Sequence, residues 1–229
     1  MNNLSDLEKK LSITFKQKKI LENVFIHRSY LNEHKNFYLP SNEKLEFLGD
    51  SVLSLVTSLF LYQNYVWLKE GDYTEIKAAI VRTESLAYAA KLLKLGDYLL
   101  LSKGQDRESG RKNKNILADC FEALIGAIFL DQGFEKANSF ILEYLFSNKL
   151  DKIIKNKQYL SPKSKLQEYT QAKFKLIPTY KLIEEIGPEH DRIFKVEVAI
   201  KQKKYGFGYG KSKKEAEEKA AKEALEEIK

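Results

Sequence analysis

The segment that most restricts the fold of this chain is residues 51–68, which contain no charged residue. Helical periodicity predicts a helix over 42–62, and its polar side chains in this stretch, Ser51, Ser54 and Thr57 among them, are small enough for close packing. A helix with so little polar surface is expected to be buried on most of its sides. The chain therefore needs other helices to cover this one.

Three acids stand at the start of this helix. Glu43, Glu46 and Asp50 occupy positions i, i+3 and i+7, which places them within ~60° of one another on a helical wheel. Acids near a helix N-terminus are favoured by the helix dipole and are commonly solvated. A helix this apolar, however, is expected to turn its acids toward a cleft. The residues alone leave both interpretations open.

A second helix is predicted over 115–130, and its only charged residues are Asp119 and Glu122. Both share their side of the helix with Gly126 and apolar residues, so no polar face receives them. Burying an unpaired carboxylate is costly. Either a basic residue of another helix pairs with them, or a cation binds there, and we favour the cation. Gly126 on the same side would let another helix approach closely.

The residue types restrict which cation this is. None of the three histidines, 27, 34 and 190, stands at the Glu-x-x-His spacing of a di-iron bundle. Zinc prefers His or Cys ligands, and Cys120, the sole cysteine, is expected to be a core residue. A site made only of carboxylates suits Mg²⁺, with Mn²⁺ able to substitute. Such ions commonly serve phosphoryl transfer.

The rest of the first part of the chain is also predicted to be helical. Capping-box spacing predicts helix starts at Ser5 and at Asp72. Another helix is expected over 135–154. The polar, glycine-containing segment 102–115 is predicted to be a surface loop.

The composition changes after Leu150, where a lysine-rich stretch leads to Ser161 and Pro162. The pattern that follows is helix, three strands, helix, and we place these elements at 164–174, 179–185, 193–201, 203–209 and 213–228. We therefore expect an all-α domain over 1–154, a linker over 155–160, and a small α+β domain of order α-β-β-β-α over 161–229.

A basic surface is expected in this second domain. The chain has a net charge of +7, and residues 198–214 contain six lysines and no acid. Such a local excess points to a polyanionic partner. Tyr205, Phe207 and Tyr209 alternate in the same window, and we expect them to pack in the sheet rather than to stack on bases.

Two further features bear on the cellular location of the protein. We find no apolar run of the length needed to span a membrane, and the first residues lack the pattern of a signal peptide. The expectation is a cytoplasmic protein without a membrane segment.

Several motifs are similar to those of a known family. The run 42–51, NEKLEFLGDS, resembles the signature of the ribonuclease III family, as do His27-Arg28-Ser29 and Asp119-x-x-Glu122. After the linker, SPKSKLQEYTQ, GPEHDRIF and GYGKSKKEAEEKAA resemble a double-stranded-RNA-binding domain. The resemblance covers nearly the whole chain, in the two-domain bacterial arrangement.

The resemblance implies a homodimeric, metal-dependent endonuclease that cuts both strands of duplex RNA and leaves 5′-phosphate and 3′-hydroxyl ends. It suggests a role in processing rRNA precursors and mRNA. Position by position, the resemblance implies a metal cluster, with two of its acids most needed for hydrolysis, and two auxiliary acids. The cluster is Glu46, Asp50, Asp119 and Glu122; the two catalytic acids are Asp50 and Glu122; the auxiliary acids are Glu43 and Glu70.

The second domain is expected to read the shape of duplex RNA. Gln167 and Glu168 would contact 2′-hydroxyls in one minor groove, and the loop carrying His190 would reach the next. Lysines at the start of the last helix, Lys211, Lys213 and Lys214, would bind phosphates between them.

Two other functions remain possible from the sequence. One is a catalytically silent duplex-RNA-binding protein of the same fold, against which stands the presence of all four cluster acids. The other is a helical, Mg²⁺-dependent nucleotide pyrophosphohydrolase, which would leave the basic second domain without a purpose.

Overall fold

The computed structural model describes residues 3–146, 154, 156, 157 and 159–228. The chain forms two units, Met1–Lys152 and Ile153–Lys229, and each is described by itself. The helix predicted over 135–154 is shorter in the structure, where it ends at Leu145. Positions 147–153 of that prediction, and 155 and 158 of the predicted linker, lie outside the described residues.

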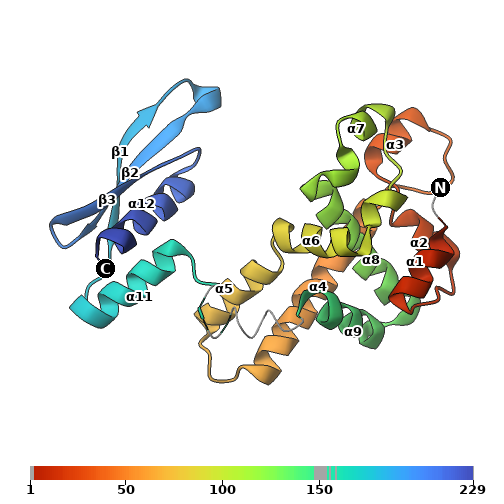
Figure 1. Ribbon diagram of the computed structural model, residues 1–229, viewed down its shortest axis with the longest axis horizontal. Helices are drawn as coiled ribbons and strands as arrows, with labels where there is room; N and C mark the ends of the chain where they lie inside the picture. Colours follow the sequence, from red (N-terminus) through yellow and green to blue (C-terminus); the bar gives the residue numbers. More distant parts are fainter. Residues whose placement is uncertain (1–2, 147–153, 155, 158, 229) are drawn as a thin grey trace. The chain divides into compact units, whose positions relative to one another are not determined.

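The first unit is helical and is built around two long helices, α4 (Glu43–Asn64) and α8 (Lys114–Gln132), which pack against each other (Figure 1). Most of α8 is buried, including Phe121, Leu124 and Ile125. Both helices lie where the sequence predicts them, within two residues at each end. The other elements cover this pair: α1 (Leu4–Leu11), α2 (Lys18–Asn23), α3 (Arg28–Glu33), α5 (Glu70–Ile80), α6 (Thr83–Leu93), η1 (Leu95–Tyr98), α7 (Lys103–Arg107), η2 (Gly110–Lys112) and α9 (Phe134–Leu145).

Two predicted helix starts differ from the structure. Asn3, not Ser5, caps α1, and its side chain accepts a hydrogen bond from the Ser5 amide at 3.0 Å. Helix α5 begins at Glu70, and Asp72 lies in its first turn, where it accepts from the Lys69 amide at 3.1 Å. In both cases an acceptor side chain near the start satisfies a free amide, but the periodicity does not say which one.

The predicted loop over 102–115 is also wrong in part, because it contains α7 and η2. These elements are too short to show a helical period in the sequence. Ser102 caps α7 by accepting from the Gln105 amide at 3.3 Å. The Arg111 side chain donates to Asp106 at 2.7 Å and to the Gly96 carbonyl at 3.0 Å, which fixes the segment against η1.

Helix α4 corrects the expectation that no stretch reaches the length of a membrane span. It is long and apolar enough by length and composition alone, with a mean hydropathy of 1.4 over an 18-residue window of which 39% is buried. A core helix passes the same test, but less than half of this window is buried. The expectation that the helix is buried on most of its sides is therefore wrong, because α4 packs against α8 but leaves Phe47, Leu55 and Tyr62 exposed.

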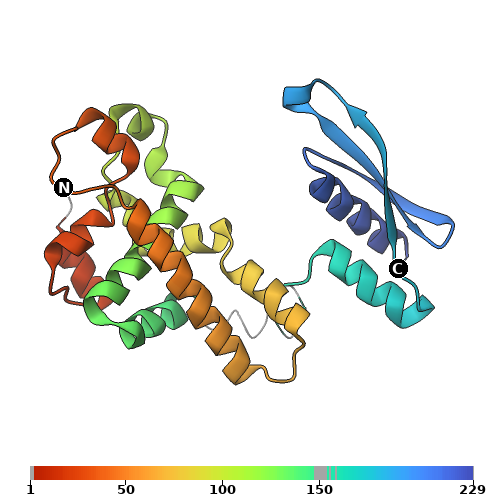
Figure 2. The ribbon, with the colours of Figure 1, turned by 180° about the vertical axis from the view of Figure 1, so that it is seen from behind.

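The second unit has the predicted order of elements: α11 (Pro162–Phe174), β1 (Thr179–Ile186), β2 (Ile193–Ile200), β3 (Lys203–Gly210) and α12 (Lys213–Glu227), with η3 (Glu189–Asp191) between the first two strands. The antiparallel sheet has the order β1-β2-β3. Ser161 caps α11 and Pro162 opens it. The two helices lie on the same side of the sheet, and the fold class is confirmed (Figures 1 and 2).

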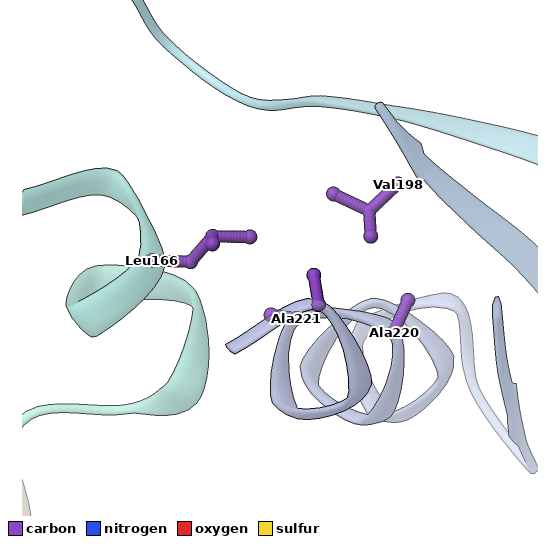
Figure 3. Close-up of a cluster of buried hydrophobic side chains, with 5 residues drawn as sticks. Leu166, Val198, Ala220 and Ala221 are labelled. Atoms are coloured by element: carbon purple, nitrogen blue, oxygen red, sulfur yellow. The ribbon is translucent and has the colours of Figure 1, made fainter. Parts of the chain in front are cut away.

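The core of this unit is small, and Figure 3 shows most of it: Leu166 of α11 and Val198 of β2 point toward the alanine face of α12. Glycines let β3 lie directly on that face. A Cβ at Gly208 would stand 1.8 Å from the Ala216 carbonyl oxygen, and one at Gly210 would stand 2.6 Å from the Ala216 amide nitrogen.

Two of the three alternating aromatic residues of β3 do not pack in the core as predicted. Because the glycines face α12, Phe207 and Tyr209 point to the opposite side of the sheet, where they are 38% and 47% exposed. Only Tyr205 packs at the edge of the core as expected. A register shift opposite Val198 and Ala199 separates it from the other two.

Candidate metal centre and RNA-binding surface

Two glycines bring α4 and α8 into backbone contact. A Cβ at Gly49 would stand 1.8 Å from the carbonyl oxygen of Glu122, and one at Gly126 would stand 2.3 Å from that of Leu45. The close approach predicted from Gly126 is confirmed. It also sets Glu46, one turn before Gly49, opposite the part of α8 that carries Glu122.

Three carboxylates converge at this contact. Oxygen atoms of Glu46, Asp119 and Glu122 all lie within 4.8 Å of one another, and the three side chains are half-buried. We call these three residues the acidic cluster. Within the described part of the chain no lysine or arginine forms an ion pair with any of them. The cluster is therefore not a structural ion pair, which was the alternative left open by the sequence.

The cluster is electrostatically strained. Burial raises the pKa of Glu122 to about 8, and the charges of Asp50, Glu46 and Asp119 add to the effect. Burial also raises the pKa of Glu46 and of Asp119, and the Arg28 guanidinium opposes both shifts. Like charges held this close repel one another unless a proton or a cation is bound. Carboxylate oxygens at this spacing fit a hard divalent cation.

Of the other predicted acids, Asp50 and Glu43 lie on α4 but do not belong to the acidic cluster. Asp50 is exposed and outside it, although its charge raises the pKa of Glu122. Glu43 opens α4, accepts from the Ser41 hydroxyl at 2.7 Å, and pairs with Arg28 at 3.8 Å between Oε1 and Nη1.

Glu70 is not brought to the cluster within one chain. It is the first residue of α5, and the Thr74 hydroxyl donates to it at 3.2 Å. It lines a hollow of about 460 Å³ together with Tyr62, near the C-terminal end of α4. The rise of a helix puts Tyr62 about 18 Å along α4 from Asp50.

A polar hollow of about 440 Å³ lies beside the cluster and was not predicted from the sequence. Asp119 lines it together with Arg28, Gln105, Asn113 and Asn115. Asn113 and Asn115, two amide side chains at the start of α8, were the available signal. His27, also in the wall, caps α3: its Nδ1 accepts from the Ser29 amide at 3.2 Å.

The structure groups some of the predicted RNA-binding residues of the second unit. His190 and Lys211 line one hollow of about 260 Å³, and Lys211 Nζ lies 3.4 Å from Asp191 Oδ1. Lys213 and Lys214 open α12 beside it and are exposed. Gln167 and Glu168 are exposed on α11, and Glu168 pairs with Lys157 at 2.7 Å. Lys213 Nζ also lies 3.9 Å from Glu185.

Comparison with known proteins identifies the family. A Ribonuclease-III-like family model matches residues 17–149, and the Double-stranded RNA binding motif matches residues 162–228. The chain belongs to the ribonuclease III family. It is a double-stranded-RNA endoribonuclease, as the resemblance implied, and the second match leaves no support for a nucleotide pyrophosphohydrolase.

Similar proteins match over nearly the whole chain. Ribonuclease 3 of Treponema denticola is 43% identical over 225 residues, which cover 98% of this chain and 91% of that protein. Ribonuclease 3 of Oceanobacillus iheyensis is 44% identical over 222 residues, with coverage of 97% and 96%. A solved nuclease domain of the ribonuclease III of Campylobacter jejuni, described with a region involved in dimer formation, has a TM-score of 0.59 and 38% identity, and the match covers 64% of this chain and 98% of that one.

Proposed function

We propose that this ribonuclease III hydrolyses phosphodiester bonds of duplex RNA at the acidic cluster and leaves 5′-phosphate and 3′-hydroxyl ends. The observation that supports this most is the convergence of Glu46, Asp119 and Glu122 without a basic partner. We further propose rRNA-precursor and mRNA processing as its role.

We propose Mg²⁺ as the cofactor, with Mn²⁺ able to replace it, held by the acidic cluster together with Asp50. Bound there, the ion would activate water and stabilise the leaving oxygen of an in-line displacement. The protein's own contribution is to hold the carboxylates in place through the backbone contact of Gly49 and Gly126. Asp50 and Glu122 are the proposed catalytic residues, and Glu43 and Glu70 are auxiliary acids.

The negative charge of the cluster has a second consequence for the reaction. Without a cation the site would repel the phosphates of the substrate, so metal binding serves recognition as well as hydrolysis. Arg28 beside Glu43 offsets part of this charge at the edge of the site.

The second domain is proposed to bind the duplex through Gln167, Glu168, His190 and the lysines Lys211, Lys213 and Lys214. Their exposure and the shared hollow of His190 and Lys211 support this. We place the domain boundaries at 1–154 and 161–229, with a linker over 155–160.

We also propose a cytoplasmic homodimer without a membrane segment. Helix α4 presents an exposed apolar stripe of Phe47, Leu55 and Tyr62, of which Phe47 is 78% exposed. A stripe of this kind on a helix marks a protein contact. The Campylobacter jejuni nuclease domain is described with a dimer-forming region. Sedimentation equilibrium of the full chain gives the mass that tests the dimer.

The catalytic proposal is tested with an end-labelled RNA duplex and the matching single strand, each incubated with Mg²⁺ or with EDTA. We expect discrete products from the duplex only, and only with Mg²⁺. Asp50→Asn and Glu122→Gln should reduce cleavage by at least about 10³-fold, since each removes a charge that holds the cation. Both should still shift the duplex on a native gel. Glu84→Gln, an exposed acid of α6, is the control and should cleave normally.

Two results would contradict the proposal. Full cleavage by Glu122→Gln would show that hydrolysis does not depend on the acidic cluster. A wild-type protein that binds the duplex but leaves it intact in Mg²⁺ would instead favour a silent binder.

A further inference from the structure

The side of the small sheet that faces away from α12 carries an uncovered apolar and basic surface. We call it the outer sheet face and define it by Ile186, Ile193, Lys195, Phe207 and Tyr209. The strand pairing places Ile186 opposite Ile193, and Tyr209 opposite Lys195. Directly opposite residues of paired strands share one face. Every member except Lys195 is at least 38% exposed.

The two aromatic rings present their faces rather than their edges to the lysine. Lys195 Nζ lies over both rings, 5.5 Å from the centroid of Phe207 and 5.5 Å from that of Tyr209. This geometry is a cation–π contact on each ring. The rings stand two residues apart on one strand, about 6.8 Å along it, so each is able to take a separate flat ligand.

Packing within the domain does not explain these rings. The helix side of β3 is closed by glycines, and a Cβ at Gly208 would already clash with α12. Phe207 and Tyr209 therefore contribute nothing to the core of Leu166, Val198 and the α12 alanines.

The charge around the rings is suited to an anionic ligand. The acid opposite Phe207, Glu197, is already paired with Lys204 at 2.7 Å. Glu184, the β1 partner of Lys195, is the acid that remains beside the rings. Lys195 lies between the rings, and Lys211 follows Tyr209 at the end of the strand. Flat aromatic surfaces interleaved with lysines are the pattern that binds unpaired nucleotides.

We propose that the outer sheet face binds unpaired nucleotides that flank the duplex, with one base stacked on Phe207, a second on Tyr209, and Lys195 on the phosphate between them. The inference rests on the duplex-binding assignment of this domain. Lys211 belongs to the proposed duplex-binding surface and stands two residues after Tyr209. The hollow that Lys211 lines includes Phe194, whose β3 partner Gly210 faces α12, so a strand that leaves the duplex there reaches the rings by passing around the end of β3.

The test measures affinities of the full chain for labelled RNAs by fluorescence anisotropy in EDTA, so that no RNA is cut. Three RNAs are compared: a blunt duplex, the same duplex with a short single-stranded extension, and that duplex with an abasic extension. We expect the ordinary extension to tighten binding by roughly tenfold, since stacking of a base on an aromatic ring has an effect of this size. The abasic extension keeps the phosphates and should lose most of that advantage.

The variant Phe207→Leu with Tyr209→Leu keeps apolar side chains but removes both rings. It should bind the blunt duplex as the wild type does and should bind the extended duplex no more tightly than the blunt one. Phe174→Leu is the matched control, because Phe174 is 39% exposed and also lies under a lysine, Lys173, at 5.6 Å, but belongs to α11. This control should keep the advantage of the extension.

Several outcomes would overturn the inference. An extension that adds no affinity would do so, as would an advantage that survives in the double leucine variant or with the abasic RNA. A double variant with lower sedimenting mass and an unchanged advantage would make the face a contact between copies of the chain instead. If the wild type fails to bind the blunt duplex in EDTA and Glu122→Gln also fails to bind it in Mg²⁺, the duplex-binding assignment itself fails, and the inference falls with it.

Discussion

The two domains both use glycine to bring backbones into contact, with opposite results for the side chains nearby. In the nuclease domain, Gly49 and Gly126 let α4 and α8 touch, and carboxylates from both helices converge beside the contact. In the small domain, the glycines of β3 let the strand touch α12, and the aromatic side chains between them lie on the far side of the sheet.

The difference follows from the period of each element. In a helix, residues three or four positions from a glycine lie on the same side as the glycine, so close approach gathers side chains. In a strand, the next residue lies on the opposite side, so close approach turns side chains away. A glycine contact thus concentrates functional groups in one domain and exposes them in the other.

The largest effect is expected from Gly49→Ala. The added Cβ would meet the Glu122 carbonyl oxygen at 1.8 Å, so α4 and α8 must separate, and overpacking of this kind costs about 3 kcal/mol. Urea unfolding measures the loss of stability, and cleavage should fall with it because the carboxylates move apart. Gly71→Ala is the control, since nothing lies within 4 Å of its Cβ, and helix propensity should make it neutral or stabilising. Equal unfolding midpoints for the two variants would contradict this account.

A smaller effect is expected from pH in the absence of metal. The pKa of Glu122 is about 8 in the folded chain against an ordinary value of 4.5, so the folded state holds a proton that the unfolded state releases. Stability contributed by this group is highest below pH 4.5 and is lost as the pH rises toward about 8. Urea midpoints measured across this range in EDTA should therefore decline.

Glu122→Gln should reduce that decline, and saturating Mg²⁺ should do the same in the wild type, because the cation takes the place of the proton. Glu84→Gln should follow the wild type. Identical pH profiles for wild type and Glu122→Gln would show that the crowding of the acids has no energetic cost.

The smallest effect is expected where charges are exposed. Lys213→Ala with Lys214→Ala should weaken duplex binding and reduce the slope of log affinity against log salt by about 2, or about 1 for each phosphate that is no longer neutralised. Lys219→Ala with Lys222→Ala removes the same charge from later turns of α12 and should change the slope less. An unchanged slope in the first variant would show that other residues bind the RNA phosphates.

The sequence predicted the long helices and the strands well because these elements are long enough for their hydrophobic period to be recognised. It also predicted the approach of a helix to Gly126, because a glycine on the same side as the two acids lets a neighbouring helix come close. The matching role of Gly49 was not recognised, because a helical wheel describes one helix and not its neighbour. The same limit applies to Glu70, whose distance from the acidic cluster is set by tertiary structure.

The aromatic residues of β3 show a different limit. Alternation correctly predicts that Phe207 and Tyr209 share a face, but it does not say which face is buried. The glycines between them carried that information, because only a strand side without Cβ atoms is able to lie on the backbone of α12.

The buried position of Cys120 has a practical consequence. Its thiol is fully buried in α8, next to Asp119, and burial raises its pKa, so the reactive thiolate is not formed in the folded protein. No other cysteine is present in the chain. The rate at which a thiol reagent labels this protein therefore reports how often the packing around α8 opens, without an engineered probe. Any cysteine introduced on the surface would be labelled before Cys120.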